Sequence, residues 1–436
     1  MAFRLKGVHV PHRKNTANVS AVKMNDVKTV TLPTVMHIGA PAVPTVKSGD
    51  KVFVGTLVAE QNGFVSSPVH SSVSGTVKSV SEILLSSGKT APCITIESDG
   101  EMTVDENITP PVITSCEDLS NALKQSGIVG LGGAGFPTYI KFGTDKPLNI
   151  QQLVINGAEC EPYITSDSVT MVDNAQDIAF ALEMLTKYFN IKNVIIGVEK
   201  NKPEAIKSMQ GIKLENAEIT VKVLPSVYPQ GGEKVLVYHT TGKVIPMGKL
   251  PIDVGCVVCN STTVATIGKY LKTGMPLVEK CVTVDGGAVS KPQNVIVPIG
   301  TPLKDVFEFC GGFKTEAHKV LYGGPMMGIT VPSLDMPILK NTNAILAFDE
   351  REATPPKTTA CIKCGACANA CPFGINPSEI SKAYRNNDFE ALEKSGVELC
   401  MECGCCSFVC PAKRPIVQNN KLAKADLREY KMKEKK

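Results

Sequence analysis

Patterns typical of buried strands alternate with helical patterns through the middle of this chain. Apolar runs predict a strand that begins at residue 153, a second over residues 193–199 and a third over residues 219–224. Helical patterns lie between them, over roughly 172–188 and 202–209. Strands that alternate with helices favour a mainly parallel sheet, whose ligands gather at the carboxyl ends of the strands. The pattern therefore predicts a central α/β domain.

Short Val, Thr and Ile runs separated by glycine turns predict a β module on each side of this domain. Residues 46–57 and 69–80 resemble the two halves of a barrel-sandwich domain of the lipoyl or biotinyl type. Residues 65–72, where such a domain carries its modifiable lysine, contain none, so a swinging-arm carrier is not predicted. The β pattern that begins at Lys280 resembles a soluble-ligand-binding β-grasp (SLBB) domain.

Composition narrows the function classes. With 436 residues, 43% hydrophobic and 20% charged, the chain is globular and long enough for several domains. A net charge of +4, no tryptophan and 5% aromatic residues argue against nucleic-acid binding. No apolar run approaches the roughly 20 residues that span a bilayer, and residues 1–14 lack the apolar core of a signal peptide. We therefore expect a cytoplasmic protein whose membrane contact is peripheral.

Two cysteine runs near the C-terminus share one spacing. Residues 361–372 and 400–411 both contain C-x2-C-x2-C-x3-C-P, the spacing with which bacterial ferredoxins hold two iron–sulfur clusters. Three thiolates of a run bind one cluster, and the fourth, next to proline, binds the other. The predicted ligands of one [4Fe-4S] cluster are Cys361, Cys364, Cys367 and Cys410, and those of the other are Cys400, Cys403, Cys406 and Cys371. Such a protein moves single electrons.

Other uses of these cysteines fit less well. Zinc favours isolated C-x2-C pairs, and disulfide frameworks belong to short secreted chains, whereas sixteen cysteines with clusters need a reducing compartment. Cys405 would break the two-residue interval if it replaced Cys406, so a packing role is expected. Cys256 and Cys259 have the C-x2-C spacing without a second pair nearby, and burial is expected for both.

A glycine-rich stretch at residues 130–135 is the second candidate site. A helix capped by Ser115 is predicted before it and Pro137 follows, whereas a dinucleotide fingerprint follows a strand, so a Rossmann site is not predicted. Consecutive glycines expose backbone N–H groups that suit a phosphate, and Lys141 lies one turn further on. A ligand cradle and a plain loop both remain open.

Four motifs, in their order along the chain, resemble the C subunits of Rnf electron-transport complexes. They are the glycine-rich loop with Phe136 and Pro137, Asn156-Gly-Ala-Glu-Cys-Glu-Pro-Tyr163, Tyr228-Pro-Gln-Gly-Gly-Glu233 and the twin cysteine runs. This resemblance covers essentially the whole chain. The central part is also similar to the NADH-binding flavoprotein subunit of respiratory complex I. The chain departs from that second pattern at Tyr139, Phe142, Ala158 and Gly232, which bear more on nicotinamide contacts than on flavin contacts.

The similarity to complex I implies a set of cofactor-binding residues. Non-covalent FMN is expected on Gly130, Gly132, Lys141, Asn156, Glu159 and Asn260. NADH is expected over Gly133, Ala134 and Phe136, in contact with Glu161, Tyr228 and Glu233, with Gly135 completing the loop. Because nicotinamide gives two electrons and cubanes accept one, a protein that joins them needs a flavin between them.

The Rnf resemblance implies a peripheral subunit on the cytoplasmic face of the membrane. Its partners would be ion-translocating membrane subunits, a ferredoxin-like subunit and NAD(H). Two alternatives remain: the related cobalamin reductase of microcompartments, and a cluster-bearing scaffold without NADH binding.

The predicted fold class is a multidomain α/β protein with β modules and a helical, two-cluster end. The expected parts are an N-terminal arm at 1–27, a barrel-sandwich domain at 28–110, an FMN- and NADH-binding α/β domain at 111–275, an SLBB-like β-grasp domain at 276–335, a linker at 336–357, a ferredoxin-like domain with two [4Fe-4S] clusters at 358–420 and a basic tail at 421–436.

Overall fold

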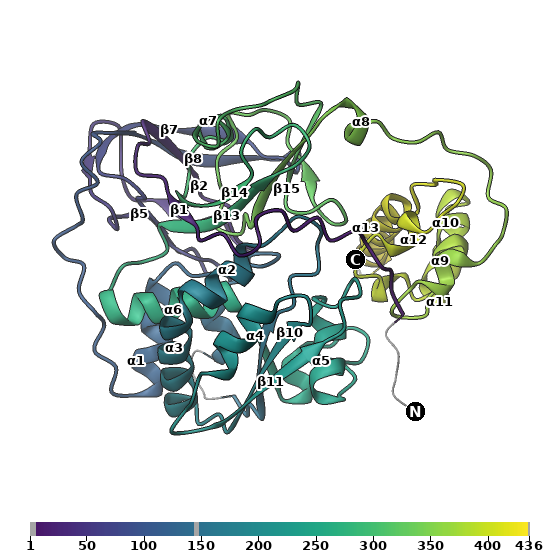
Figure 1. Cartoon of the computed structure of the whole chain (residues 1–436), viewed down its shortest axis with the longest axis horizontal. Helices are drawn as coiled ribbons and strands as arrows, with labels where there is room; N and C mark the ends of the chain where they lie inside the picture. The colour runs from purple at the N-terminus through teal and green to yellow at the C-terminus, as the bar shows by residue number, and fades with distance from the viewer. Residues whose placement is uncertain (1–5, 144–147, 435–436) are drawn as a thin grey trace.

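The computed structural model describes residues 6–143 and 148–434. Two β units and an α/β unit pack together, and a group of short helices at the C-terminus lies to one side of them (Figure 1). An extended segment after α8 (Glu350–Ala353) leads into this helical group. The predicted multidomain α/β architecture with β modules is confirmed.

The α/β unit has a four-stranded parallel sheet in the order β11-β10-β9-β12. Side chains alternate between its faces, so Leu153 and Ile155 pack on one side with α3 and α6, while Val154 packs on the other with α5. The strands are β9 (Gln152–Gly157), β10 (Asn193–Glu199), β11 (Glu218–Leu224) and β12 (Cys256–Asn260). The helices are α1 (Cys116–Gln125), α2 (Ser166–Asp173), α3 (Ala175–Tyr188), α4 (Pro203–Gln210), α5 (Glu233–Thr241) and α6 (Ser261–Thr273), with 3-10 turns η1 (Thr138–Phe142) and η2 (Pro251–Val254).

Two predictions for this unit have different outcomes. The Ser115 cap of α1 is confirmed, since its side chain accepts from the Asp118 N–H and Asp118 returns the contact in a capping box. The helix predicted over roughly 172–188 is found as α3, which begins three residues later than predicted, because α2 ends at Asp173 and Asn174 lies between the two helices. Asparagine competes with helical backbone bonding and favours helix ends, which explains the break.

The barrel-sandwich unit consists of two antiparallel sheets, β2-β8-β7-β4 and β3-β5-β6. Its strands are β2 (Thr29–Pro33), β3 (Val43–Pro44), β4 (Lys51–Val52), β5 (Leu57–Glu60), β6 (Val69–His70), β7 (Gly75–Leu84) and β8 (Thr90–Ser98). Buried Lys340 joins this unit to the start of the glycine-rich segment, because its ammonium donates to the carbonyls of Pro68 and Gly127 at 2.6 and 2.7 Å.

The SLBB unit has a six-stranded mixed sheet in the order β1-β14-β13-β17-β15-β16. Its strands are β1 (Val22–Lys23), β13 (Glu279–Asp285), β14 (Gln293–Pro298), β15 (Lys319–Tyr322), β16 (Ile329–Thr330) and β17 (Ala344–Phe348), with helix α7 (Leu303–Phe309). Strand β17 lies inside the predicted linker at 336–357, so that prediction is wrong there. Its five residues are apolar and all buried between β13 and β15, which is the pattern of a central strand. Strand β1 likewise draws part of the predicted arm into this sheet.

The C-terminal unit is built from four short helices and one long helix around the two cysteine runs. They are α9 (Ala366–Asn369), α10 (Pro377–Arg385), α11 (Phe389–Lys394), α12 (Cys405–Phe408) and α13 (Ile416–Glu434), with a 3-10 turn η3 (Val397–Leu399). Helix α13 runs across the predicted boundary between the cluster domain at 358–420 and the basic tail at 421–436. Ala423 and Leu427 of α13 are buried beside Ile380 of α10, so the described tail residues continue the core of this unit.

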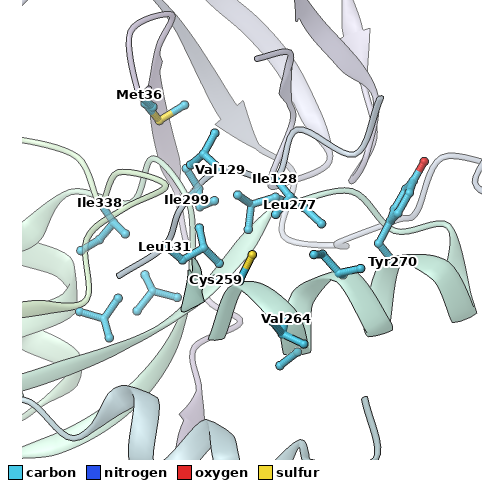
Figure 2. Close-up of a cluster of buried hydrophobic side chains, with 14 of the residues drawn as sticks. Met36, Ile128, Val129, Leu131, Cys259, Val264, Tyr270, Leu277, Ile299 and Ile338 are labelled. Atoms are coloured by element: carbon cyan, nitrogen blue, oxygen red, sulfur yellow. The ribbon is translucent and has the colours of Figure 1, made fainter. Parts of the chain in front are cut away.

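A shared hydrophobic core fixes the flanks of the glycine-rich loop. Val129 and Leu131 lie in it with Val264 of α6 and Cys259 of β12, which is almost fully buried (Figure 2). The predicted burial of both Cys256 and Cys259 is confirmed. Because the core holds Leu131, the residues that follow it project outward at a fixed place.

Candidate functional site

The glycine-rich loop is a tight turn at the edge of the α/β unit. The N–H of Gly130 donates to the carbonyl of Phe136 at 2.8 Å and closes the turn. A Cβ on Gly132 would lie 2.4 Å from the amide nitrogen of Asn260, whereas one on Gly133 would meet nothing within 4 Å. The residues at its tip that are exposed are Gly132, Gly133 and Ala134. The close approach of Asn260 therefore favours glycine at position 132, whereas the space around Gly133 is open to a ligand.

Polar side chains from three elements hold the loop from below. The N–H of Leu131 donates to the Thr263 hydroxyl at 2.9 Å. The carbonyl of Leu131 accepts from the buried Lys280 ammonium at 2.7 Å. Burial lowers the pKa of Lys280 to about 8. Asn260 donates to the Asp167 carboxylate at 2.7 Å and also caps α6. Sequence reasoning missed Thr263, Lys280 and Asp167, although a lysine inside an apolar strand was a signal for Lys280.

The carboxyl ends of neighbouring strands bring two predicted residues together. Asn156 of β9 and Asn260 of β12 are partners in the parallel register. The Asn156 amide donates to the carbonyl of Gly231 at 2.9 Å, and the N–H of Gly231 donates to the thiol of Cys160 at 3.2 Å. The segment that precedes α5 is thus fixed to the end of β9.

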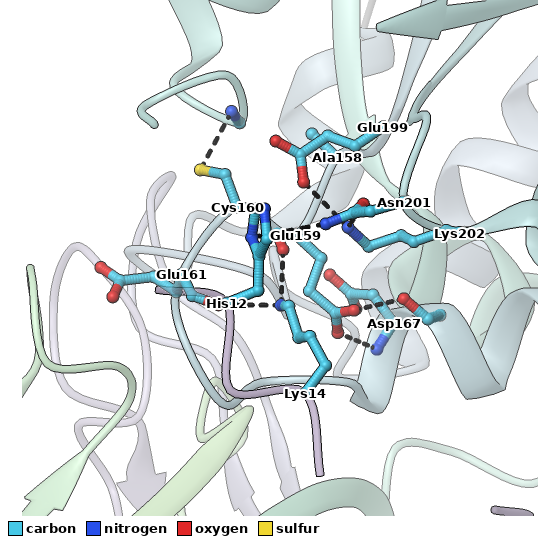
Figure 3. Close-up of polar contacts among 12 residues, drawn as sticks. His12, Lys14, Ala158, Glu159, Cys160, Glu161, Asp167, Glu199, Asn201 and Lys202 are labelled. Carbon is cyan, nitrogen blue, oxygen red and sulfur yellow. Dashed lines mark hydrogen bonds and ion pairs between the residues drawn. The ribbon is translucent and has the colours of Figure 1, made fainter. Parts of the chain in front are cut away.

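Glu159 lies on the far side of the same strand end. Its carboxylate accepts from the N–H of Asp167 at 2.6 Å and from the Ser168 hydroxyl, so it binds the first turn of α2. Lys14 of the N-terminal arm reaches this loop and donates to the carbonyls of Glu159 and Glu161, each at 2.8 Å (Figure 3). Burial lowers the pKa of Lys14 and raises that of Glu159. Sequence reasoning did not assign Lys14 to the site.

Glu161 and Tyr228 face the other units of the chain. The Glu161 carboxylate accepts from the N–H of Met326 at 3.0 Å, and one of its oxygens lies 3.5 Å from the Tyr228 hydroxyl. The same hydroxyl donates to the carbonyl of Cys403 at 2.8 Å. Burial raises the pKa of Glu161 to about 7. Tyr228 therefore joins the α/β unit directly to the second cysteine run.

The other two predicted charged residues lie apart from this contact. Glu233 is the exposed first residue of α5, beyond the Gly231 turn. The Lys141 ammonium donates to the carbonyl of Val258 in β12 at 2.8 Å. The predicted flavin and nicotinamide contacts thus lie at one edge of the sheet but form separate groups.

The predicted ligands of one cluster line a common cavity. Cys371 of the first run lies in its wall with Cys400, Cys403 and Cys406 of the second run, and Cys405 also lines it. Cysteines of both runs therefore line one cavity, and the assignment of four of them to one cluster stays a prediction. The thiol of Cys405 is buried and points toward the carbonyl of Tyr228 at 3.9 Å.

The other predicted cluster set has a different environment. Cys367 and Cys410 are buried in one small apolar cluster, whereas Cys361 and Cys364 are exposed on a loop. Across residues 6–143 and 148–434, no three His, Cys, Asp or Glu side chains lie close enough to hold a single metal ion. A cubane needs more widely spaced ligands, because each thiolate binds a different iron atom.

The second run packs against the α/β unit at a glycine. A Cβ on Gly232 would lie 2.3 Å from the terminal methyl of Met401. Val8 and Val10 of the arm, Tyr228 and Cys405 share one small apolar cluster with the Met401 side chain at its margin. The cavity that contains Cys403 therefore adjoins the candidate flavin edge.

Curated relatives align with nearly the whole chain. The C subunit of the Na(+)-translocating ferredoxin:NAD(+) oxidoreductase complex of Acetobacterium woodii is 41% identical, over 97% of this chain and 96% of the relative. Its counterpart in the proton-translocating complex of Clostridium ljungdahlii is 39% identical, over 97% and 93%. The C subunit of the ion-translocating oxidoreductase complex of Rhodobacter capsulatus is 38% identical, over 97% and 83%. This chain belongs to the family of Rnf complex C subunits.

Family models match four successive parts of this Rnf protein. They are the RnfC barrel sandwich hybrid domain at 2–101, the Nuo51 FMN-binding domain at 123–269, the SLBB domain at 281–330 and the 4Fe-4S dicluster domain at 357–421. A solved NAD+-reducing [NiFe]-hydrogenase is similar with a TM-score of 0.49 and 16% identity, over 70% of this chain and 60% of that chain, which is too distant to support an argument. In the described ranges, no helix has the length and apolarity to cross a membrane.

The residues present fit the two kinds of cofactor that these models imply. A tip with an open Gly133 and exposed backbone suits a phosphate, and a cavity lined by five cysteines offers the thiolates that a cubane needs. This Rnf protein thus carries an FMN-binding domain and a two-cluster domain in direct contact through Tyr228.

Proposed function

We propose that this Rnf protein exchanges hydride between NAD(H) and a non-covalent FMN and passes single electrons through two [4Fe-4S] clusters. Its partners are Rnf-type membrane subunits and a ferredoxin-like protein, at the cytoplasmic face of the membrane. The observation that carries the proposal is the Tyr228 hydroxyl, which is 2.8 Å from the Cys403 carbonyl and 3.5 Å from the Glu161 carboxylate. Relatives named as ferredoxin:NAD(+) oxidoreductase subunits support it.

Bound flavin supplies the conversion between two-electron and one-electron transfer. The chain positions and shields it. Gly132, Gly133 and Ala134 offer backbone donors, Asn260 and Asn156 hold the loop and the strand end in register, and Lys141 supplies a nearby positive charge. Cys371, Cys400, Cys403 and Cys406 would hold the adjoining cluster. No protein side chain needs to donate or accept a proton during hydride transfer.

An anaerobic NADH titration of the purified holoprotein tests this function. The flavin absorbance should bleach first and the cluster absorbance should follow, with about eight irons and one flavin per chain. A flavin that stays oxidised under NADH would contradict the proposal and would favour the cluster-bearing scaffold. Membrane fractions should also retain the protein together with ion-translocating partners, which a microcompartment cobalamin reductase would not require.

Two neighbouring glycines give a matched pair of variants. Gly132→Val places carbon atoms where the Asn260 amide lies, so flavin content should fall while iron stays at about eight. Gly133→Ala adds a Cβ in open space and should keep both cofactors. Loss of iron in Gly132→Val would show that the loop is structural for the whole chain.

A further inference from the structure

The loop that carries Cys361 and Cys364 lies on the surface of the C-terminal unit. Both cysteines are exposed, and Ile362 between them has 68% of its surface exposed. In the proposed function, hydride is exchanged at the flavin, whereas single electrons must pass between a cluster and a redox centre of another protein. A cluster with exposed ligands is the natural point for this exchange.

Basic side chains surround this loop. The N–H of Thr359 donates to the carbonyl of Ala412 at 3.0 Å, and Arg414 donates to the carbonyl of Thr359 at 3.3 Å. These bonds hold residues 357–359 beside 412–414. The basic rim is defined as Lys357, Lys363, Lys413 and Arg414, of which the three lysines are exposed.

No acidic residue offsets this charge along the two segments. Residues 353–378 and 403–425 contain neither Asp nor Glu. The four positive charges of the rim exceed the charge of about −2 of an oxidised cubane with four thiolates, so the net field over the exposed loop is positive and attracts an acidic surface.

The other cluster faces inward. Its ligand Cys403 accepts the Tyr228 hydrogen bond through its carbonyl, and neighbouring Met401 packs at Gly232 of the α/β unit. A cluster in this position lies between the candidate flavin edge and the first run. The two clusters are thus arranged as an inner and an outer one.

We propose that the basic rim is the docking surface for an acidic iron–sulfur electron carrier, which exchanges electrons with the outer cluster held by Cys361, Cys364, Cys367 and Cys410. This inference rests on the proposed electron-transfer function. Each transfer oxidises one cluster by one electron and reduces the other by one, and no bond forms or breaks. A lipid surface could also attract the rim, but it offers no redox centre to the exposed cysteines.

Stopped-flow mixing with a reduced acidic ferredoxin tests the docking surface. An acidic two-cluster ferredoxin, reduced with dithionite and freed of excess reductant, is mixed with the oxidised full-length holoprotein. Lys357→Glu combined with Lys413→Glu should lower the second-order rate of cluster reduction about ten-fold at low salt. The difference should shrink at high salt, where charges are screened. Lys357 precedes the first predicted ligand, Cys361, in the sequence. Lys357→Glu alone should lower the second-order rate by a smaller factor of about three.

A matched control carries the same change in net charge elsewhere. Lys192→Glu combined with Lys213→Glu alters two exposed lysines of the α/β unit and should change the rate less than about two-fold. Iron of about eight per chain in every variant shows that the clusters are retained.

Three results would overturn the docking proposal. The first is an unchanged rate of cluster reduction in Lys357→Glu. The second is a loss of rate in the control variant equal to that in Lys357→Glu combined with Lys413→Glu. The third is a loss of binding to anionic phospholipid vesicles in that double rim variant while its rate with ferredoxin is unchanged. Electrons come from ferredoxin in this experiment. A failure of NADH to bleach the flavin would therefore defeat the proposed function without altering the docking result.

Discussion

The two cysteine runs have the same spacing and the same local backbone but different surroundings. Lys363 and Glu402, at equivalent positions, both have positive φ, 55° and 62°. Each run then passes through a left-handed glycine into a four-residue helix. Yet Cys361 and Cys364 are exposed, whereas Cys400 and Cys403 are buried.

The difference arises from what packs on each run. Ile362 of the first run projects from the surface, while Met401 at the equivalent position fits against Gly232. Glu402 is paired with Lys424 of α13 at 3.1 Å, and Lys363 has no acidic neighbour in its segment. A repeated motif can therefore lie in two different environments, one packed against the α/β unit and one exposed at the surface.

Removing one ligand from each run should separate these roles most strongly. Cys400→Ser and Cys361→Ser should each lower iron from about eight to about four. Cys400→Ser should also abolish reduction of the remaining cluster by NADH, because the proposed path from the flavin runs through the inner cluster. Cys361→Ser should leave the inner cluster reducible. Anaerobic NADH titration with electron paramagnetic resonance measures both, and equal behaviour of the two variants would break the comparison.

Filling the contact at Gly232 should slow electron transfer at the inner run. Gly232→Val would press on the Met401 methyl, which would lie 2.3 Å from a Cβ at this position, and should weaken docking by about 1–3 kcal/mol. Cluster reduction should then lag behind flavin bleaching in stopped-flow traces. Adding Met401→Ala makes room and should restore the rate. A lag that persists in the double variant would show that the contact is not the cause.

Protonation of Glu161 should make the folded chain more stable at low pH. Burial raises its pKa from 4.5 to about 7, so the folded chain keeps a proton that the unfolded chain has lost. Stability should therefore fall as pH rises from about 4.5 to about 7 and then level off. Glu161→Gln should reduce the difference in melting temperature between pH 5 and pH 8. The exposed Glu233→Gln is the control, and an unaltered pH dependence in Glu161→Gln would contradict the assignment.

Replacing Cys405 should have the smallest effect. Its thiol lies in the wall of the inner cavity beside the four predicted ligands, so Cys405→Ala should keep about eight irons. Iron analysis measures this directly. A fall to about four irons would show that Cys405, and not Cys406, is the ligand.

Much of the candidate site follows from local sequence. The cap at Ser115 and the strand that carries Asn156 near its carboxyl end were predictable, because capping and strand periodicity depend on near neighbours. The cross-tied set with Cys371 follows from spacing alone, and the structure places it in one cavity. Whether these side chains bind flavin and iron stays a prediction.

Other parts could not be predicted from near neighbours. Lys14 is separated from Glu161 by almost 150 residues, yet its ammonium fixes the loop that carries that glutamate. Strand β17 was assigned to a linker in the prediction. It is a strand because it pairs with β13 and β15 of the SLBB unit, and such pairing cannot be seen in its own few residues. Asp167 joins the site only because α2 begins beside Asn260.

By itself, the sequence determined the chemistry: eight cysteines at ferredoxin spacing and a glycine-rich loop followed by Asn156 and Glu161. Spacing of this kind acts over a few residues, where backbone geometry is almost fixed by the residue types. Only the tertiary structure decided which cluster faces inward. That choice depends on Tyr228 and Gly232 meeting Cys403 and Met401, a contact between segments about 170 residues apart in sequence.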